Sequence, residues 1–203
     1  MSGDGSPEPL LPESWSAYYT ANTMPWDLGG VTPALVDWVK NNDPKGLRIL
    51  VPGCGQGHDA HFLAKAGARV TAVDYATEAL DKARSLYPKS SVTWLVEDVT
   101  TMVFSEPFDL VWEYTCFCAL KPIQRPTYLA QLHKSLKAGG RYLGMVFLKV
   151  NDPLKGPPFQ VDPSEFRALL AAHYHLAMME EGTGRSVKDR RGQEIWFEAV
   201  AQP

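Results

Sequence analysis

Short apolar runs alternate with segments of helical periodicity along most of the chain. The apolar runs predict buried strands at residues 47–51, 69–74, 92–98, 108–114 and 141–150. Apolar residues that recur every three or four positions predict helices at residues 32–42, 58–67, 77–87, 125–140 and 162–174. The last two apolar runs, residues 174–182 and 193–201, predict strands with no helix between them.

This alternation is typical of βαβ crossovers and predicts an α/β protein with a mainly parallel sheet. We expect seven strands, helices on both faces, and an antiparallel pair at one edge. Thr32 and Thr77 are predicted helix caps, and Gly139 and Gly140 are predicted to end the helix at residues 125–140. No repeat or long linker divides the 203 residues, so the core should form one domain.

Composition excludes several classes of protein. The net charge of -3 gives no electrostatic case for nucleic acid, and no apolar run approaches the roughly 20 residues that span a bilayer. The N-terminus lacks the pattern of a signal peptide, so we expect a cytoplasmic location. Cys54, Cys116 and Cys118 show no framework spacing, which fits a reducing compartment. No cysteine or histidine group has convincing ligand spacing, so we expect no metal.

A glycine-rich turn follows the first strand of the predicted sheet. Gly53, Gly55 and Gly57 stand at every second position in "VPGCGQGHD", just before a predicted helix. The carboxyl end of such a strand is the usual ligand crevice, and glycine lets a ligand approach the backbone. A dinucleotide turn needs G-x-G-x-x-G, whereas G-x-G-x-G resembles motif I of methyltransferases that use S-adenosylmethionine (AdoMet). The spacing therefore favours AdoMet over a nicotinamide cofactor.

Carboxylates at the ends of the next two strands support a nucleoside ligand. Asp74 ends the second strand, where it can accept hydrogen bonds from two ribose hydroxyls. Asp98 ends the third strand, where it can accept from an adenine amino group, with the Val99 N–H near the ring. Tyr75 can pack on the adenine, although plain packing explains this residue as well.

Four segments carry a more specific resemblance: residues 24–30, 50–59, 112–126 and 155–161. Together with "RRGQE" at residues 190–194, they resemble the thiopurine S-methyltransferase family, most closely its plant and fungal branch of thiol and halide methyltransferases. The resemblance runs from about Trp15 to the C-terminus. It implies the Rossmann-like fold of class I methyltransferases, with AdoMet as cofactor.

The resemblance also divides the chain and implies a lid. Residues 1–30 would form an N-terminal aromatic lid segment, and residues 31–203 the methyltransferase domain. Trp15, Tyr19 and Trp26 match the aromatic segment that closes over AdoMet, and aromatic faces suit a sulfonium cation. Tyr19 departs from the family pattern, because relatives often carry tryptophan there.

Three residues are implied near the methyl acceptor. Glu113 and Tyr114 match the family's acid–tyrosine pair, which implies a cofactor contact for Glu113 and a place beside the nucleophile for Tyr114. Arg125 matches an arginine near the substrate, and Phe159 a wall of the acceptor pocket. Methyl transfer to a soft anion needs alignment and a dry site more than acid–base groups, so we assign no general base.

The expected activity is AdoMet-dependent methyl transfer to a small soft nucleophile, such as a thiol, hydrosulfide or halide, by a monomer. O- or N-methylation of a small metabolite stays open, as does a non-catalytic binder of AdoMet or S-adenosylhomocysteine (AdoHcy). A nicotinamide oxidoreductase is disfavoured by the glycine spacing.

Overall fold

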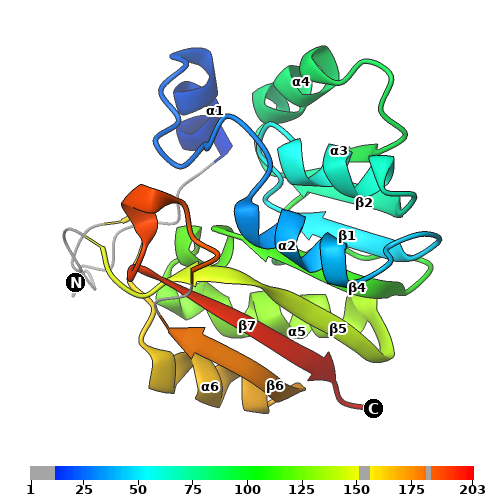
Figure 1. The fold of residues 1–203 in the computed structure, drawn as a ribbon. Coiled ribbons are helices and arrows are strands. Elements are labelled where there is room, and N and C mark those ends of the chain that lie inside the picture. The colour runs from blue at the N-terminus through cyan, green and yellow to red at the C-terminus, as the bar shows by residue number, and fades with distance from the viewer. Residues whose placement is uncertain (1–11, 151–155, 182–183) are drawn as a thin grey trace, which may run out of the picture.

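The computed structural model describes residues 12–150, 156–181 and 184–203. Within this part of the chain, seven strands form one sheet in the order β3-β2-β1-β4-β5-β7-β6 (Figure 1). The strands are β1 (Arg48–Pro52), β2 (Arg69–Asp74), β3 (Thr93–Val96), β4 (Phe108–Tyr114), β5 (Leu136–Phe147), β6 (Tyr174–Glu181) and β7 (Glu194–Ala201). Strands β1 to β5 are parallel, and β7 pairs antiparallel with both β5 and β6. The predicted mostly parallel sheet with an antiparallel edge pair is confirmed.

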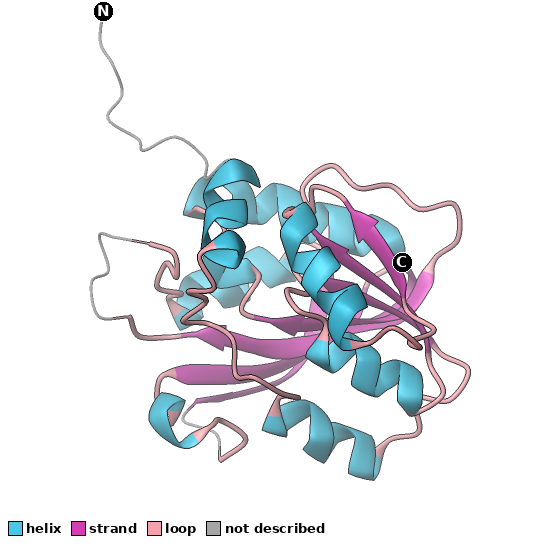
Figure 2. Cartoon of the chain, turned by 90° about the horizontal axis from the view of Figure 1, so that it is seen from above, coloured by secondary structure: helices cyan, strands magenta, loops and turns pink. Residues whose placement is uncertain are grey.

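Helices cover both faces of this sheet, as the view from above shows (Figure 2). They are α1 (Pro12–Thr20), α2 (Pro33–Asn41), α3 (His58–Lys65), α4 (Thr77–Leu86), α5 (Arg125–Ser135) and α6 (Pro163–Ala171). Three short 3₁₀ turns are η1 (Phe117–Ala119), η2 (Pro122–Gln124) and η3 (Lys188–Arg190). None of the helices in the described ranges is long and apolar enough to cross a membrane.

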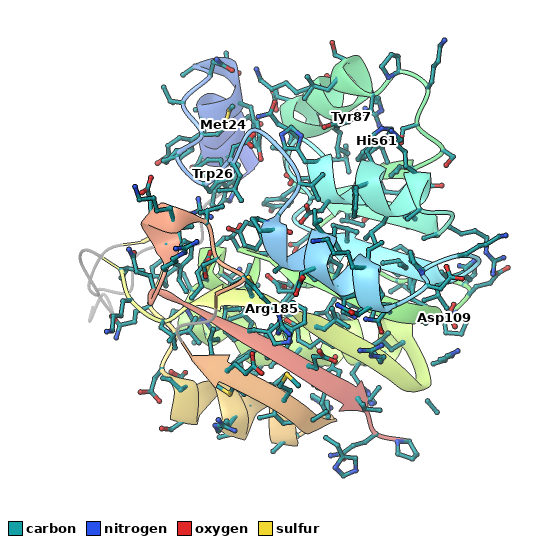
Figure 3. The ribbon with its side chains drawn as sticks, viewed as in Figure 1. Met24, Trp26, His61, Tyr87, Asp109 and Arg185 are labelled. Atoms are coloured by element: carbon teal, nitrogen blue, oxygen red, sulfur yellow. The ribbon has the colours of Figure 1, made fainter. Side chains whose placement is uncertain are left out.

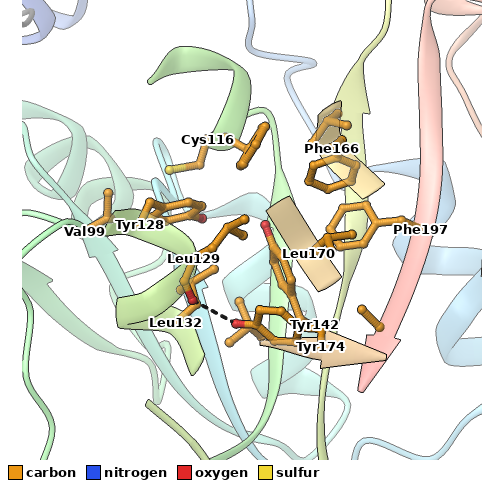
Figure 4. Close-up of a cluster of buried hydrophobic side chains, with 14 of the residues drawn as sticks. Val99, Cys116, Tyr128, Leu129, Leu132, Tyr142, Phe166, Leu170, Tyr174 and Phe197 are labelled. Carbon is orange, nitrogen blue, oxygen red and sulfur yellow. Dashed lines mark hydrogen bonds between the residues drawn. The ribbon is translucent and has the colours of Figure 1, made fainter. Parts of the chain in front are cut away.

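Strand residues alternate between two cores, one on each face of the sheet. Ile49 and Val51 of β1 join the cluster packed by α2 and α3, whereas Leu50 between them joins the cluster packed by α5 and α6. The second cluster is rich in aromatic rings, among them Tyr128, Tyr142, Tyr174, Phe166 and Phe197 (Figure 4). The Tyr174 hydroxyl finds a partner there by donating to the Leu129 carbonyl at 3.2 Å. Packing in these two cores fixes the positions of the strand ends, and therefore of the loops that follow them.

The predicted end of the fifth helix was wrong. Helix α5 ends at Ser135, and Leu136 begins β5 by pairing with Phe108. Leu136 is buried in the aromatic core, so its apolar side chain continued the helical pattern although the backbone had already become a strand. Gly139, with φ of +72°, lies in the irregular register between the first pairing and Arg141.

The two predicted threonine caps also differ from the structure. Thr32 occupies the cap position of α2, but its side chain donates to Asp59 Oδ2 at 2.9 Å and makes no capping bond. Its backbone N–H donates to the other oxygen of Asp59 at 2.8 Å. Ala76, and not Thr77, is the cap residue of α4. Tertiary contact with α3 therefore outweighed local capping at Thr32.

Replacing Gly57 by alanine should strongly destabilise the fold. Gly57 has φ of +75°, and an added Cβ would lie 2.4 Å from the Trp94 ring. We expect urea unfolding to show a loss of about 2–4 kcal/mol from backbone strain and overpacking together. Gly46→Ala is the matched control, because φ is +78° and nothing lies within 4 Å of the added Cβ. Equal losses in the two variants would contradict the Trp94 contact.

Candidate active site

A cavity of about 560 Å³ opens at the carboxyl ends of β1, β2 and β4. Its size lies in the usual range for small-molecule sites, about 300–1,000 Å³. It is lined from the N-terminal segment, the strand ends, and three later loops. The lining residues are Trp15, Tyr18, Tyr19, Pro25, Trp26, Gly53, Asp74, Tyr75, Asp98, Val99, Thr115, Cys116, Ala119, Leu120, Lys121, Gln124, Phe147, Pro157, Pro158, Phe159, Asp189, Arg190 and Gln193. A smaller cleft adjoins it and shares Trp26, Gly53 and Thr115.

The three glycines of the turn have different surroundings. All three have positive φ, between +54° and +75°. Gly53 lines both the cavity and the cleft, and an added Cβ would lie 2.7 Å from Cys116 Sγ. Gly55 lines only the cleft, and Gly57 lies away from both, against Trp94. The turn therefore needs glycine for close packing as well as for its backbone angles.

Asp74 connects the glycine turn to the end of β2. Its carboxylate accepts from the Gly55 N–H at 2.8 Å and from the Ala76 N–H at 3.0 Å, while the side chain still lines the cavity. Burial raises the pKa of Asp74, and the backbone hydrogen bonds oppose this shift. Asp98 was predicted to end the third strand, but β3 ends at Val96, because Asp98 turns the chain by accepting from Thr100 N and Oγ1, each at 2.7 Å.

Trp26 is the centre of the aromatic segment over the cavity. Its ring centroid lies 5.4 Å from that of Trp15, 5.0 Å from Tyr18 and 6.0 Å from Tyr19. Edge-to-face pairs of this kind stabilise by about 0.5–1.5 kcal/mol beyond simple burial. Figure 3 shows Trp26 between α1 and the segment that precedes β7. The aromatic cluster thus joins the N-terminal segment to the cavity mouth.

Polar contacts fasten this segment on two sides. Arg190 Nη2 donates to the Trp26 carbonyl at 2.8 Å and to the Pro25 carbonyl at 3.4 Å. On the other side, Asp27 accepts from the Gln56 side chain and lies 3.3 Å from His58 Nε2. The pKa of Asp27 is lowered overall, because hydrogen bonds from His58 and Gly29 outweigh the effect of its burial.

Glu113 lies beneath the loop that follows β4 and does not line the cavity. Its fully buried carboxylate accepts from the Phe117 N–H at 2.8 Å, from the Tyr142 hydroxyl at 3.3 Å and from the Tyr128 hydroxyl. Burial raises the pKa of Glu113 to about 7, although these hydrogen bonds act in the opposite direction. Above it, Thr115 has φ of +64°, an uncommon angle for a β-branched residue. Glu113 therefore holds the cavity loop in shape.

Arg125 also lies behind the cavity wall. Its Nη2 donates to the carbonyls of Phe159 and Gln160, both at 3.2 Å, and its guanidinium lies 4.9 Å from the Phe117 ring centroid. Its side chain is almost fully buried, and it does not line the cavity. Arg125 therefore anchors the loop that carries Phe159.

Tyr114 and Arg190 bring a polar group to the boundary between cavity and cleft. Tyr114 lines the cleft and Arg190 the cavity, and Arg190 Nη1 donates to the Tyr114 oxygen at 2.6 Å. Tyr114 in turn donates to Glu194 Oε1 at 3.0 Å. Sequence reasoning gave no role to Arg190 or Glu194, although both lie in the "RRGQE" segment. The spacing of residues in the sequence could not show that this segment contacts Tyr114 at the end of β4.

The cysteine pair after β4 is buried. Cys116 lines the cavity beside Gly53, and the Cys118 thiol donates to the Thr115 carbonyl at 3.2 Å. Burial raises the pKa of Cys116 well above its ordinary value and that of Cys118 to about 12. Both thiols therefore stay protonated near neutral pH and serve as packing groups in this loop.

Topology and site together define a Rossmann-like fold of the class I methyltransferase type, with its cavity at the carboxyl ends of the parallel strands. Among solved structures, 1,6-didemethyltoxoflavin-N1-methyltransferase of Burkholderia thailandensis, with AdoHcy bound, matches with a TM-score of 0.73 and 22% identity. The match covers 95% of this chain and 87% of that one. At this identity the likeness shows the fold alone.

The chain belongs to the thiopurine S-methyltransferase family, whose model matches residues 10–202. It is 33% identical to thiocyanate methyltransferase 1 of Arabidopsis thaliana over 184 residues, covering 89% of this chain and 81% of that protein. It is 32% identical to probable thiol methyltransferase 2 of the same plant, with the same coverage. The family predicted from the motifs is thereby confirmed.

Glu113→Gln should remove a pH dependence of stability. The folded-state pKa of about 7 exceeds the ordinary 4.5, so the folded protein holds this proton more tightly than the unfolded chain. Its stabilising contribution is complete below pH 4.5 and is lost as the pH rises through 7. Urea unfolding across this range should show a wild-type loss of about 3 kcal/mol relative to the glutamine variant. Tyr128→Phe should keep the slope, because it leaves the carboxyl in place; parallel wild-type and glutamine profiles would contradict the assignment.

Proposed function

We propose that this protein transfers a methyl group from AdoMet to a small sulfur nucleophile. The observation that carries the proposal is one cavity lined both by the carboxylates of Asp74 and Asp98 and by the aromatic rings of Trp15, Tyr19 and Trp26. Membership of the thiopurine S-methyltransferase family and the names of the two plant relatives support a sulfur acceptor.

The residues of the cavity suit AdoMet. Asp74 and Asp98 offer carboxylates for the ribose and adenine, with Tyr75 and Val99 beside them. Trp15, Tyr19 and Trp26 offer ring faces for the sulfonium. Of the predicted lid at residues 1–30, residues 1–11 lie outside the described residues; we propose that residues 12–30 act as the lid over the domain at 31–203. Gly53 lets the methionine part lie close to the backbone. We propose no direct cofactor contact for Gly57 or Glu113, because neither lines the cavity.

The proposed acceptor end combines apolar side chains with two cations, Arg190 and the buried Lys121. Phe147, Pro157, Pro158, Phe159 and Leu120 line it, and Arg190 is near the Phe147 ring, with its guanidinium carbon 5.2 Å from the ring centroid. Apolar walls suit a polarisable sulfur or halide, and a guanidinium attracts the anionic form of either. We therefore propose that Arg190, rather than Arg125, faces the acceptor.

AdoMet supplies an electrophilic methyl group on a sulfonium with a neutral leaving group. The protein's part is to align the nucleophile with that methyl and to exclude water. Tyr114 and Thr115, at the end of β4, form the floor between cofactor and acceptor in this proposal. In this proposal the aromatic segment keeps the mouth closed, held by Arg190 at the Trp26 carbonyl and by His58 at Asp27.

A headspace assay tests the activity. Purified protein is incubated with AdoMet and, separately, hydrosulfide, a small alkyl thiol and iodide, and methylated volatiles are quantified by gas chromatography. Methanethiol or a methyl thioether would support the proposal, and methyl iodide would extend it to halides. AdoMet binding without any volatile product would contradict the sulfur acceptor and direct the search to larger O- or N-nucleophiles.

Asp74→Ala should weaken AdoHcy binding tenfold or more. A hydrogen bond to a charged group contributes about 1.5–3 kcal/mol, and the variant also frees the Gly55 N–H. Isothermal titration calorimetry measures the change. Asp81→Ala, on the exposed side of α4, is the matched control and should bind as wild type. An unchanged Kd in Asp74→Ala would remove this residue from the site.

A further inference from the structure

A buried polar network joins the end of β4 to the start of β7. The Tyr114 hydroxyl donates to Glu194 Oε1 at 3.0 Å, and Arg190 Nη1 donates to the Tyr114 oxygen at 2.6 Å. A phenol oxygen has two lone pairs. With its proton directed at Glu194 and one lone pair directed at Arg190, Tyr114 retains one acceptor position. Tyr114 is partly exposed and lines the cleft that shares Trp26, Gly53 and Thr115 with the cavity.

Glu194 is an unusual member of this network because it is almost completely buried, and its Oε2 has no hydrogen-bond partner among the described residues. Phe147 pairs with it on β5, and the buried Ser186 lies near from the preceding loop. The charged and ionisable groups that face it are Tyr114 from β4 and Arg190 from η3, whose Nη1 lies 3.8 Å from Oε1. A buried carboxylate with an unused oxygen is costly, and beside a cleft this marks a functional group.

The raised pKa of Glu194 favours uptake of a proton by its carboxylate. Burial raises its pKa above the ordinary value, and Ser186, Tyr114 and Arg190 only partly offset this effect. The carboxylate is therefore a better proton acceptor than an exposed glutamate. Arg190 supplies the complementary effect, since its hydrogen bond stabilises negative charge that develops on the Tyr114 oxygen.

We propose that Glu194 is the proton acceptor for a protic thiol substrate and that Tyr114 relays the proton to it. The acceptor S–H bond and the sulfonium–methyl bond of AdoMet break, and a new S–CH₃ bond forms. The thiol proton moves to the Tyr114 oxygen as the Tyr114 proton moves to Glu194 Oε1. Tyr114 ends neutral, Glu194 ends as the carboxylic acid, and the neutral leaving group is AdoHcy. The reverse path returns the proton to solvent after the product leaves.

This assignment rests on the proposed function and narrows its substrate class. A free thiol with a pKa near 8.5 is only a few per cent ionised at neutral pH, so an internal base increases the reactive fraction. Iodide and thiocyanate have no proton to lose. The relay therefore serves thiols specifically, and a site used only for halides would not need Glu194.

The experiment compares Glu194→Gln with wild type on two acceptors, a small alkyl thiol and iodide, at saturating AdoMet. At pH 7 we expect the loss of kcat/KM with the thiol to exceed the loss with iodide by at least tenfold. From pH 6 to the solution pKa of the thiol, the variant's thiol rate should rise about tenfold per pH unit, because only pre-formed thiolate reacts. The wild-type thiol profile should be flatter, and the iodide profile should keep its shape.

Two further variants show whether a loss of activity in Glu194→Gln comes from the broken relay or from a general effect on folding. Tyr114→Phe leaves Glu194 in place but breaks the relay, so it should reproduce the discrimination between thiol and iodide. Glu198→Gln is the matched control on β7, since Glu198 pairs with Arg141 at 2.7 Å and not with Tyr114; it should not discriminate. Calorimetry with AdoHcy separates a lost relay from lost cofactor binding.

Equal losses on both acceptors, or no loss with the thiol, would overturn the relay and leave Glu194 as a structural residue. A thiol profile of Glu194→Gln that matches wild type would do the same. If the wild-type protein binds AdoMet but methylates neither acceptor, this result contradicts the proposed function itself. It then also contradicts the relay, which depends on that function.

Discussion

The hydrogen bond from the Gly55 N–H to the Asp74 carboxylate is the contact on which the site depends. It joins the turn after β1 to the end of β2, and it is possible because Gly55 has φ of +54°. Gly53 in the same turn brings the backbone against Cys116, after β4. Three neighbouring strand ends are therefore held together at one edge of the sheet, and the cavity is the space above them.

Two buried carboxylates behind the cavity have separate tasks. Glu113 holds the loop after β4 by accepting from the Phe117 N–H and from two tyrosine hydroxyls, so both of its oxygens have structural partners. Among the residues that the structure describes, one oxygen of Glu194 has no hydrogen-bond partner, and the other contacts a tyrosine that borders the cleft. The difference in satisfied hydrogen bonds, rather than in burial, is the reason to assign chemistry to Glu194 alone.

Arg190 connects the cofactor, lid and acceptor parts of the proposed site. One nitrogen holds the carbonyls of Pro25 and Trp26, and the other holds Tyr114. Closure of the aromatic segment and positioning of the tyrosine therefore depend on one guanidinium, whose planar geometry can serve both partners at once. In the proposed mechanism, the relay is assembled when the lid is closed, which excludes water at the moment of transfer.

The sequence by itself determined the order of strands and helices from α2 onward, the glycine turn, Asp74 at the end of β2 and the family, because local periodicity or a short motif indicates each of them. It did not predict α1, and it extended the third strand to Asp98, past the end of β3 at Val96. It misjudged the end of α5, since Leu136 is apolar in either conformation. Arg125, which the resemblance implied near the substrate, lies behind the cavity wall. Only the tertiary structure decided which charged groups surround the cavity. Tyr114 and Glu194 are brought together by the pairing of β4 with β5 and of β5 with β7, and Arg190 reaches them from η3. Such long-range contacts leave no local periodicity in the sequence, so the meeting of Tyr114, Arg190 and Glu194 could be found only in the fold.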